Sequence, residues 1–193
     1  PSPSPLKGLR PPSPGFLVFF ILLASDLHVS YQDMRSGLRG KYGVKPANRF
    51  MVMALEEARA AAGRGEVPVG AVIVHQDRVL ARAGNRTRER QDVTAHAEIE
   101  AIRAAAKVLG SERLVDADLY VTLEPCAMCA AAISFARIRR LYYGATDPKG
   151  GAVDSGVRFY TSPTCHHAPD IYSGIAETEA SDILQDFFRQ RRD

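Results

Sequence analysis

The stretch that decides the fold is Leu119-Tyr120-Val121-Thr122-Leu123-Glu124-Pro125-Cys126-Ala127-Met128-Cys129. Residues 119–123 are mostly apolar and predict a buried strand, whereas residues 127–135 predict a helix. Cys126 and Cys129 are three residues apart, so at the start of a helix their thiols point to the same side and can share one metal ion. The sequence therefore predicts a strand that runs directly into a helix carrying a metal-binding cysteine pair.

His96 and Glu98 add an imidazole and a carboxylate to this pair. Three protein ligands, His96, Cys126 and Cys129, would leave the fourth tetrahedral position of a zinc ion open to water. Glu98 lies about 200° around an ideal helix from His96, which favours a proton carrier over a further ligand. Zinc lowers the pKa of a bound water toward about 7, and a nearby carboxylate can carry that water's proton to a leaving ammonia. The pattern thus indicates hydrolysis at a ring carbon.

Helix starts are predicted at both halves of this metal site. The partial positive charge of two helix N-termini would stabilise thiolates there. A closed structural zinc site is the alternative, with a fourth ligand drawn from Cys165, His166, His167 or His75. Glu98 and Pro125 favour the catalytic interpretation, because a closed structural site has no use for the glutamate.

The rest of the chain from about residue 46 alternates helices with strands. Helices are predicted over 49–62 and 94–109, and a last helix by the apolar stripe Ala180, Ile183, Leu184, Phe187 and Phe188. Strands are predicted over 69–74, 79–83 and 141–143, the first two forming a hairpin. In the helix over 94–109, the predicted buried face carries Ile99, Ile102, Ala106 and Leu109. This alternation predicts an α/β fold, with a mixed sheet between layers of helices.

Residues 1–45 differ in composition from the rest of the chain. Six prolines lie within the first fourteen positions, and the apolar run Phe16–Ala24 is too short for a membrane helix, which needs about 20 residues. A signal peptide is an alternative, because Lys7 and Arg10 precede the run, although the prolines and the lack of a methionine at position 1 argue against it. We expect a proline-rich or disordered N-terminal extension, whose role the sequence leaves open, before a domain over 46–193.

Composition narrows the class of protein. With 46% hydrophobic and 24% charged residues, the chain is typical of a globular protein, and we expect no membrane partner. Its three cysteines suit a reducing, cytoplasmic environment. The net charge of +3 neither requires nor excludes a nucleic acid. The arginines, however, form three clusters: Arg82, Arg86, Arg88 and Arg90; Arg137, Arg139 and Arg140; and Arg189, Arg191 and Arg192.

Longer motifs surround these residues. His96-x-Glu98 with Pro125-Cys126-x-x-Cys129 is the signature of zinc nucleobase deaminases. Together with the segments EVPVGAV (66–72), GNR (84–86), TAHAE (94–98) and DFFR (186–189), it closely resembles the bacterial tRNA adenosine deaminases of the cytidine deaminase superfamily, from about residue 50 to 192. The resemblance implies a three-layer α/β/α sandwich with a mixed five-stranded sheet, so that 46–193 would be a zinc-dependent deaminase domain with one Zn²⁺ per subunit.

The resemblance also implies an activity and a set of contacts. It implies conversion of adenosine to inosine at the wobble position of a tRNA anticodon, typically in an arginine tRNA, by a homodimer that binds the anticodon stem-loop. Glu98 would be the catalytic residue, and the substrate-binding residues would be Asn85, Ala97, Asp147 and Arg189. Asn85 would hydrogen-bond the purine and Asp147 would contact the nucleotide beside the target. Turn chemistry for Asn85, loop solvation for Asp147 and a solvated helix end for Arg189 are the alternatives.

Two other functions remain open from the sequence. A deaminase of free bases or nucleosides, such as guanine or cytosine, would share the metal chemistry but need no basic surface for RNA. A zinc-stabilised RNA-binding module without catalysis is the second alternative, and the presence of Glu98 argues against it.

Overall fold

The computed structural model describes residues 46–191. The N-terminal extension, with its apolar run, lies outside the described residues, as does Arg192. The helices are α1 (Pro46–Gly63), α2 (Ala97–Leu109), α3 (Ala127–Phe135) and α4 (Glu177–Arg189), with a short 3-10 helix η2 (Phe159–Thr161). The strands are β1 (Gly70–His75), β2 (Arg78–Gly84), β3 (Ala117–Leu123), β4 (Arg140–Ala145) and β5 (Asp170–Tyr172).

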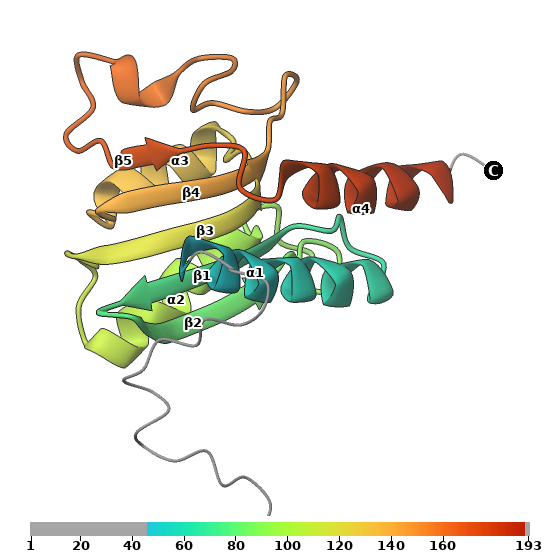
Figure 1. Ribbon diagram of the computed structural model, residues 1–193. Coiled ribbons are helices and arrows are strands. Elements are labelled where there is room, and N and C mark those ends of the chain that lie inside the picture. Colours follow the sequence, from blue (N-terminus) through green and yellow to red (C-terminus); the bar gives the residue numbers. More distant parts are fainter. Residues whose placement is uncertain (1–45, 192–193) are drawn as a thin grey trace, which may run out of the picture. The chain divides into compact units, whose positions relative to one another are not determined.

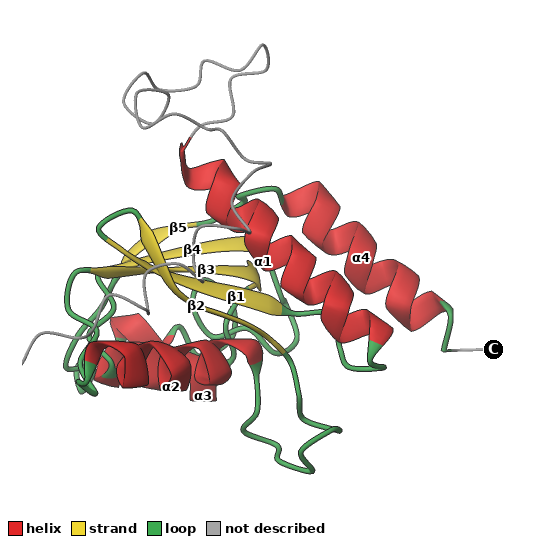
Figure 2. Ribbon diagram, turned by 90° about the horizontal axis from the view of Figure 1, so that it is seen from below, coloured by secondary structure: helices red, strands yellow, loops and turns green. Residues whose placement is uncertain are grey.

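The strands form one five-stranded sheet in the order β2-β1-β3-β4-β5 (Figure 1). The β1 strand is antiparallel to β2 and β3, whereas β3, β4 and β5 run parallel, so the sheet is mixed. Helices α1 and α4 cover one face, and α2 and α3 cover the other (Figure 2). The predicted three-layer α/β/α sandwich with a mixed five-stranded sheet is confirmed.

Most of the predicted elements form, with informative shifts at their ends. The β1–β2 hairpin turns through Gln76 and Asp77, both at positive φ, the geometry that suits the twist of a two-residue hairpin. Helix α2 begins at Ala97 and not at residue 94, because His96 is an extended N-cap residue. Gly110 ends α2 in the left-handed conformation, as the glycine predicts. The sequence did not locate β5, which has only three residues, all exposed.

The sheet separates two hydrophobic cores. One lies between the sheet and α2 and α3, and the other lies between the sheet and α1 and α4. Of the predicted apolar face of α2, Ile99 is buried and Ile102 and Ala106 pack partly buried against the core, whereas Leu109 is exposed. The fully buried residues are Ala97, Ala101 and Ala105, so the buried face is centred beside the predicted one. Small side chains let α2 approach the sheet closely, which fixes the position of its N-terminus and of His96.

No helix in the described part of the chain combines the length and apolar character needed to cross a membrane.

Candidate active site

Two helix N-termini bring the predicted metal ligands together. His96 is the N-cap residue of α2, and Cys126 is the N-cap residue of α3, with Cys129 in the first turn of that helix. Strand β3 leads to Cys126 through Glu124 and Pro125, so the parallel β3–α3–β4 connection places the cysteines at the carboxyl edge of the sheet. The three ligand atoms lie within 4.8 Å of one another.

The donor set fits zinc. Nδ1 of His96 lies 3.7 Å from Sγ of Cys126 and 3.6 Å from Sγ of Cys129. A zinc ion with bonds of about 2.3 Å to sulfur and about 2.0–2.1 Å to nitrogen separates two such donors by about 3.6 Å at a tetrahedral angle. Spacing and ligand chemistry therefore both suit Zn²⁺.

The two thiols strongly affect each other's ionisation. A hydrogen bond with Cys129 lowers the pKa of Cys126 to about 4. The same contact, with burial, raises the pKa of the Cys129 thiol. One thiolate is therefore readily available, and ionisation of the second requires a nearby cation, which is the effect of a divalent metal on a coordinating thiol.

Glu98 lies beside the ligands without belonging to the set. This residue is 4% exposed and lines the same pocket as His96 and Cys126. Burial raises the pKa of Glu98 above that of an ordinary glutamate. A carboxyl group with a raised pKa holds a proton more readily than an ordinary glutamate, which suits general acid–base catalysis. The burial and position of Glu98 are therefore those that a proton carrier requires.

The alternative fourth ligands lie elsewhere. Cys165 contacts Oγ of Ser134 at 3.6 Å and the carbonyl of His167 at 3.2 Å, and Nε2 of His167 is bonded to the carbonyl of Ile138. Among the described residues, none of Cys165, His166, His167 and His75 joins the set of His96, Cys126 and Cys129. These four residues therefore do not close the site.

A pocket of about 300 Å³ adjoins the Glu98 carboxyl group. It is lined by Val67, Val69, Asn85, Thr87, His96, Glu98, Leu123, Glu124, Cys126, Asp147 and Gly150. Asn85 is 6% exposed, and its Oδ1 accepts the backbone N–H of Ala97 at 2.8 Å. Because the oxygen faces Ala97, the NH₂ end of the same amide is the end left for a ligand. Asn85 therefore offers the pocket a fixed donor.

The other predicted substrate-binding residues differ in placement. Asp147 lines the pocket, and its Oδ1 accepts the backbone N–H groups of Lys149 and Gly150 at 3.1 and 3.0 Å. Ala97 is fully buried, does not line the pocket and uses its N–H to bind Asn85. Arg189 lies on α4, where it is exposed and pairs with Asp186 at 3.1 Å.

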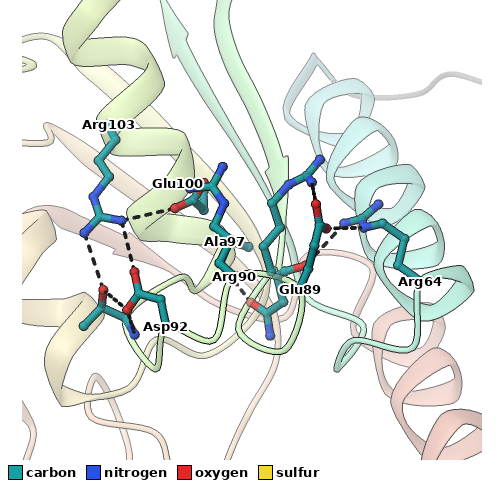
Figure 3. Close-up of polar contacts among 10 residues, drawn as sticks. Arg64, Glu89, Arg90, Asp92, Ala97, Glu100 and Arg103 are labelled. Atoms are coloured by element: carbon teal, nitrogen blue, oxygen red, sulfur yellow. Dashed lines mark hydrogen bonds and ion pairs between the residues drawn. The ribbon is translucent and has the colours of Figure 1, made fainter.

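Ion pairs within the chain occupy much of the first arginine cluster. Arg82 pairs with Glu56 and Glu57 of α1. The next arginines lie in the loop that leads to α2, where Arg90 pairs with Glu100 at 2.6 Å (Figure 3). Glu100 also binds Arg103, and Glu89 of the same loop pairs with Arg64 (Figure 3). These contacts fix the loop that carries His96.

The remaining arginine clusters are also partly engaged. Arg139 pairs with Asp118 at 3.0 Å, and Arg137 donates to the carbonyl of His166. Arg191 donates to the carbonyl of Gly65 at 2.8 Å, and its guanidinium lies over the ring of Phe187. Several arginines of the three clusters are therefore engaged in contacts within the chain and are not free to bind a phosphate.

Two buried glutamates of the pocket region were not predicted. Glu66 is 1% exposed and accepts the N–H groups of Arg88 and Glu89, so it holds the loop before α2. Glu124 is 2% exposed and accepts N–H groups of residues 147–155. Both stand inside the quoted motifs EVPVGAV and LYVTLEPC, and a glutamate within an apolar run was the available signal.

Three candidate metal ligands beside a buried carboxylate, at the N-termini of α2 and α3 in a three-layer sandwich, are the arrangement of the deaminases of the cytidine deaminase superfamily. Comparison with known proteins is more specific. The sequence profile of the MafB19-like deaminase family matches residues 46–192. A tRNA-specific adenosine deaminase of Agrobacterium fabrum is 71% identical over 143 residues, which are 74% of this chain and 94% of the relative. A tRNA-specific adenosine deaminase of Bacillus subtilis is 42% identical, and the match covers 74% of this chain and 89% of the relative.

A solved structure supports the same assignment. It comes from a study of A-to-I editing by tRNA deaminases at the wobble position of transfer RNA, and it matches with a TM-score of 0.70 and 72% identity over 70% of this chain and 99% of that chain. A guanine deaminase from Nitrosomonas europaea, at 19% identity and a TM-score of 0.63, shares the fold. The chain belongs to the family of bacterial tRNA-specific adenosine deaminases.

Proposed function

We propose that this protein is a zinc-dependent hydrolytic deaminase that converts adenosine to inosine at the wobble position of a tRNA anticodon. The observation that carries the proposal is the continuity of the catalytic pocket with an adjoining groove. Val67, Leu123 and Asp147 line both the pocket and a groove of about 460 Å³. The groove continues to Thr146, Lys149, Leu184 and Phe188.

This shape suits a nucleotide that is part of a polymer. A free base needs only the pocket beside Glu98, whereas a base extruded from an RNA loop brings its ribose, its phosphates and its neighbours. Lys149 and Arg189 are exposed near the groove residues Asp147 and Phe188. Cations in these positions can contact phosphates without reading sequence. The pocket itself would read the target base.

His96, Cys126 and Cys129 would hold one zinc ion per subunit. When bound, zinc would lower the pKa of a water molecule toward neutral pH. Glu98 takes a proton from the water as the new C6–O bond of the purine forms. It gives a proton to the amino nitrogen as the C6–N bond breaks, so that ammonia leaves and inosine remains.

Three other side chains would position the substrate. The NH₂ group of Asn85, directed away from Ala97, would donate to the purine. Asp147 would contact the nucleotide beside the target, and Arg189 would follow the RNA backbone from α4. The choice of an arginine tRNA comes from the family resemblance. Sequencing the tRNA of cells depleted of this protein tests that choice, because inosine should disappear from one wobble position.

The family resemblance also supports a homodimer. Phe135 at the end of α3 is 70% exposed, and Val157 in the loop that follows β4 is 71% exposed. A subunit interface would remove such side chains from water. Light scattering should give the mass of two chains at micromolar concentration, and a monomer alone would contradict the dimer.

The experiment that tests the function compares substrates directly. Zinc-loaded protein would be incubated with an anticodon stem-loop that carries adenosine at the wobble position, and separately with free adenosine and free guanine. We expect ammonia release and inosine formation with the stem-loop. Release from a free compound in preference to the stem-loop would contradict the proposal and favour a base or nucleoside deaminase.

A further inference from the structure

Glu124 is a buried carboxylate whose bonds in the described structure go to N–H and O–H groups and not to a cation. Its Oε1 accepts the backbone N–H groups of Val153, Asp154 and Ser155 at 3.1, 3.0 and 2.8 Å. Its Oε2 accepts the N–H of Asp147 and the hydroxyl of Ser155, each at 2.9 Å. One side chain thus binds both ends of segment 147–155.

The same segment crosses the backbone of the metal-ligand motif. Ala152 donates its N–H to the carbonyl of Pro125 at 2.9 Å, and Gly151 forms an isolated β-bridge with Cys126. A Cβ at Gly151 would lie 2.5 Å from Cδ of Glu124 and 2.5 Å from the carbonyl oxygen of Asp147, so only glycine fits at this position. The segment is therefore fixed between Glu124 and the residues that hold the metal.

One wall of the pocket comes from this segment. Asp147 and Gly150 both line the pocket, together with Asn85, Glu98 and Glu124 from other elements. Residues 148–150 are at most partly buried, so burial contributes little to their placement. Burial of Ala152 and Val153 holds one end of the segment, and the hydrogen bond from Asp147 to Glu124 holds the end that lines the pocket.

We propose that Glu124 is a positioning residue for the deamination, which acts by holding Asp147 and the segment around it against the pocket. This inference rests on the proposed function, in which Asp147 contacts the nucleotide beside the target base. Glu124 itself contributes to substrate binding through the placement of Asp147. Its effect should therefore appear in KM for the RNA and depend on the presence of the Asp147 side chain.

A glutamine at this position has the same shape but one acceptor. If its oxygen takes the place of Oε1, the three N–H groups of Val153, Asp154 and Ser155 keep their partner. Its NH₂ group then faces the N–H of Asp147, and two donors cannot bond to each other. Glu124→Gln therefore releases the Asp147 end of the segment in particular.

The test is a double-mutant cycle in the zinc-loaded full chain, with Glu124→Gln, Asp147→Ala and the double variant. We expect Glu124→Gln to raise KM for the anticodon stem-loop at least tenfold, to change kcat less than threefold, and to retain one zinc per subunit. The double variant should be no worse than the more damaging single change, because both act through one contact. Additive effects, or an unchanged KM for Glu124→Gln, would overturn the proposal.

Two further variants make the result interpretable. Asp118→Asn is the control, because Asp118 on β3 is a largely buried carboxylate that binds Arg139 and does not line the pocket. It should leave KM unchanged. If Glu124→Gln does not fold, Ser155→Ala removes one bond to Oε2, and its combination with Asp147→Ala gives the same cycle. Wild-type protein that fails to deaminate the stem-loop would instead refute the proposed function.

Discussion

Asn85 uses the two ends of its amide for different purposes, and two substitutions separate them. In the wild type, Oδ1 of Asn85 accepts the N–H of Ala97 at 2.8 Å. Asn85→Asp keeps an oxygen for this bond but has no NH₂ donor for the purine. Asn85→Ala removes both. Position 85 is 6% exposed, so the alanine variant also leaves the N–H of Ala97 buried without a partner.

The magnitudes follow from these contacts. Loss of a donor to the base costs about 2 kcal/mol of transition-state binding, or about 30-fold in kcat/KM, for both variants. An unsatisfied buried N–H costs about 1–3 kcal/mol of folding stability in the alanine variant alone. A carboxylate near the N-terminus of α2 is favourable, so the aspartate variant should unfold near the wild-type midpoint.

The assay measures kcat, KM and zinc content for both variants with the anticodon stem-loop, and urea unfolding for stability. We expect kcat to fall more than KM rises, since the lost contact is to the base inside the pocket. Wild-type kcat/KM in Asn85→Asp would refute the assignment of the NH₂ group to the substrate. Equal loss of stability in both variants would refute the role of the bond to Ala97.

Two further predictions concern pH and salt. Burial alone would raise the pKa of Glu66, but hydrogen bonds from Glu89, Arg88 and Thr87 outweigh it and hold this pKa below its ordinary value of 4.5. The stability that Glu66 contributes is therefore complete above pH 4.5 and is lost as the pH falls through the lower pKa of the folded state. The difference in unfolding midpoint between wild type and Glu66→Gln should narrow below pH 4.5. A gap of constant size down to about pH 3 would contradict this. Replacing Arg189, Arg191 and Arg192 by alanine should weaken stem-loop binding and flatten its salt dependence without changing which nucleotide is deaminated. Arg189→Ala alone tests RNA binding without loss of the hydrogen bond from Arg191 to Gly65. If the triple variant kept the wild-type affinity and salt dependence, these arginines would not contact the RNA.

The sequence predicted the parts of this protein that local rules determine. The cysteine spacing, the helix-ending Gly110 and the strand before Pro125 each follow from contacts within a few residues. Cys126 and Cys129 were predicted to lie together because they share one helix start, and the structure also brings His96, which caps another helix, to them. That the three bind a metal stays a prediction.

Features that depend on distant residues were not predictable. Strand β5 exists because its three residues pair with β4, and a run of only three residues is too short to indicate a strand even though Ile171 and Tyr172 favour one. The buried face of α2 depends on how closely the helix approaches the sheet, which selected its alanines. Whether Arg90 is free or paired depends on Glu100, ten residues later and on another element. Glu124 likewise owes its role to residues 147–155, whose position the sequence alone does not specify.

The most direct test of the proposed chemistry uses Glu98→Gln beside the wild type. Both proteins would be loaded with zinc, measured for metal per subunit, and incubated with an anticodon stem-loop that carries adenosine at the wobble position. We predict one zinc per subunit in both proteins, inosine at that single position with the wild type, and a rate at least about 10²-fold lower with Glu98→Gln. Near-normal inosine formation by the metal-loaded Glu98→Gln variant would contradict this chemistry, because another group would then carry the proton.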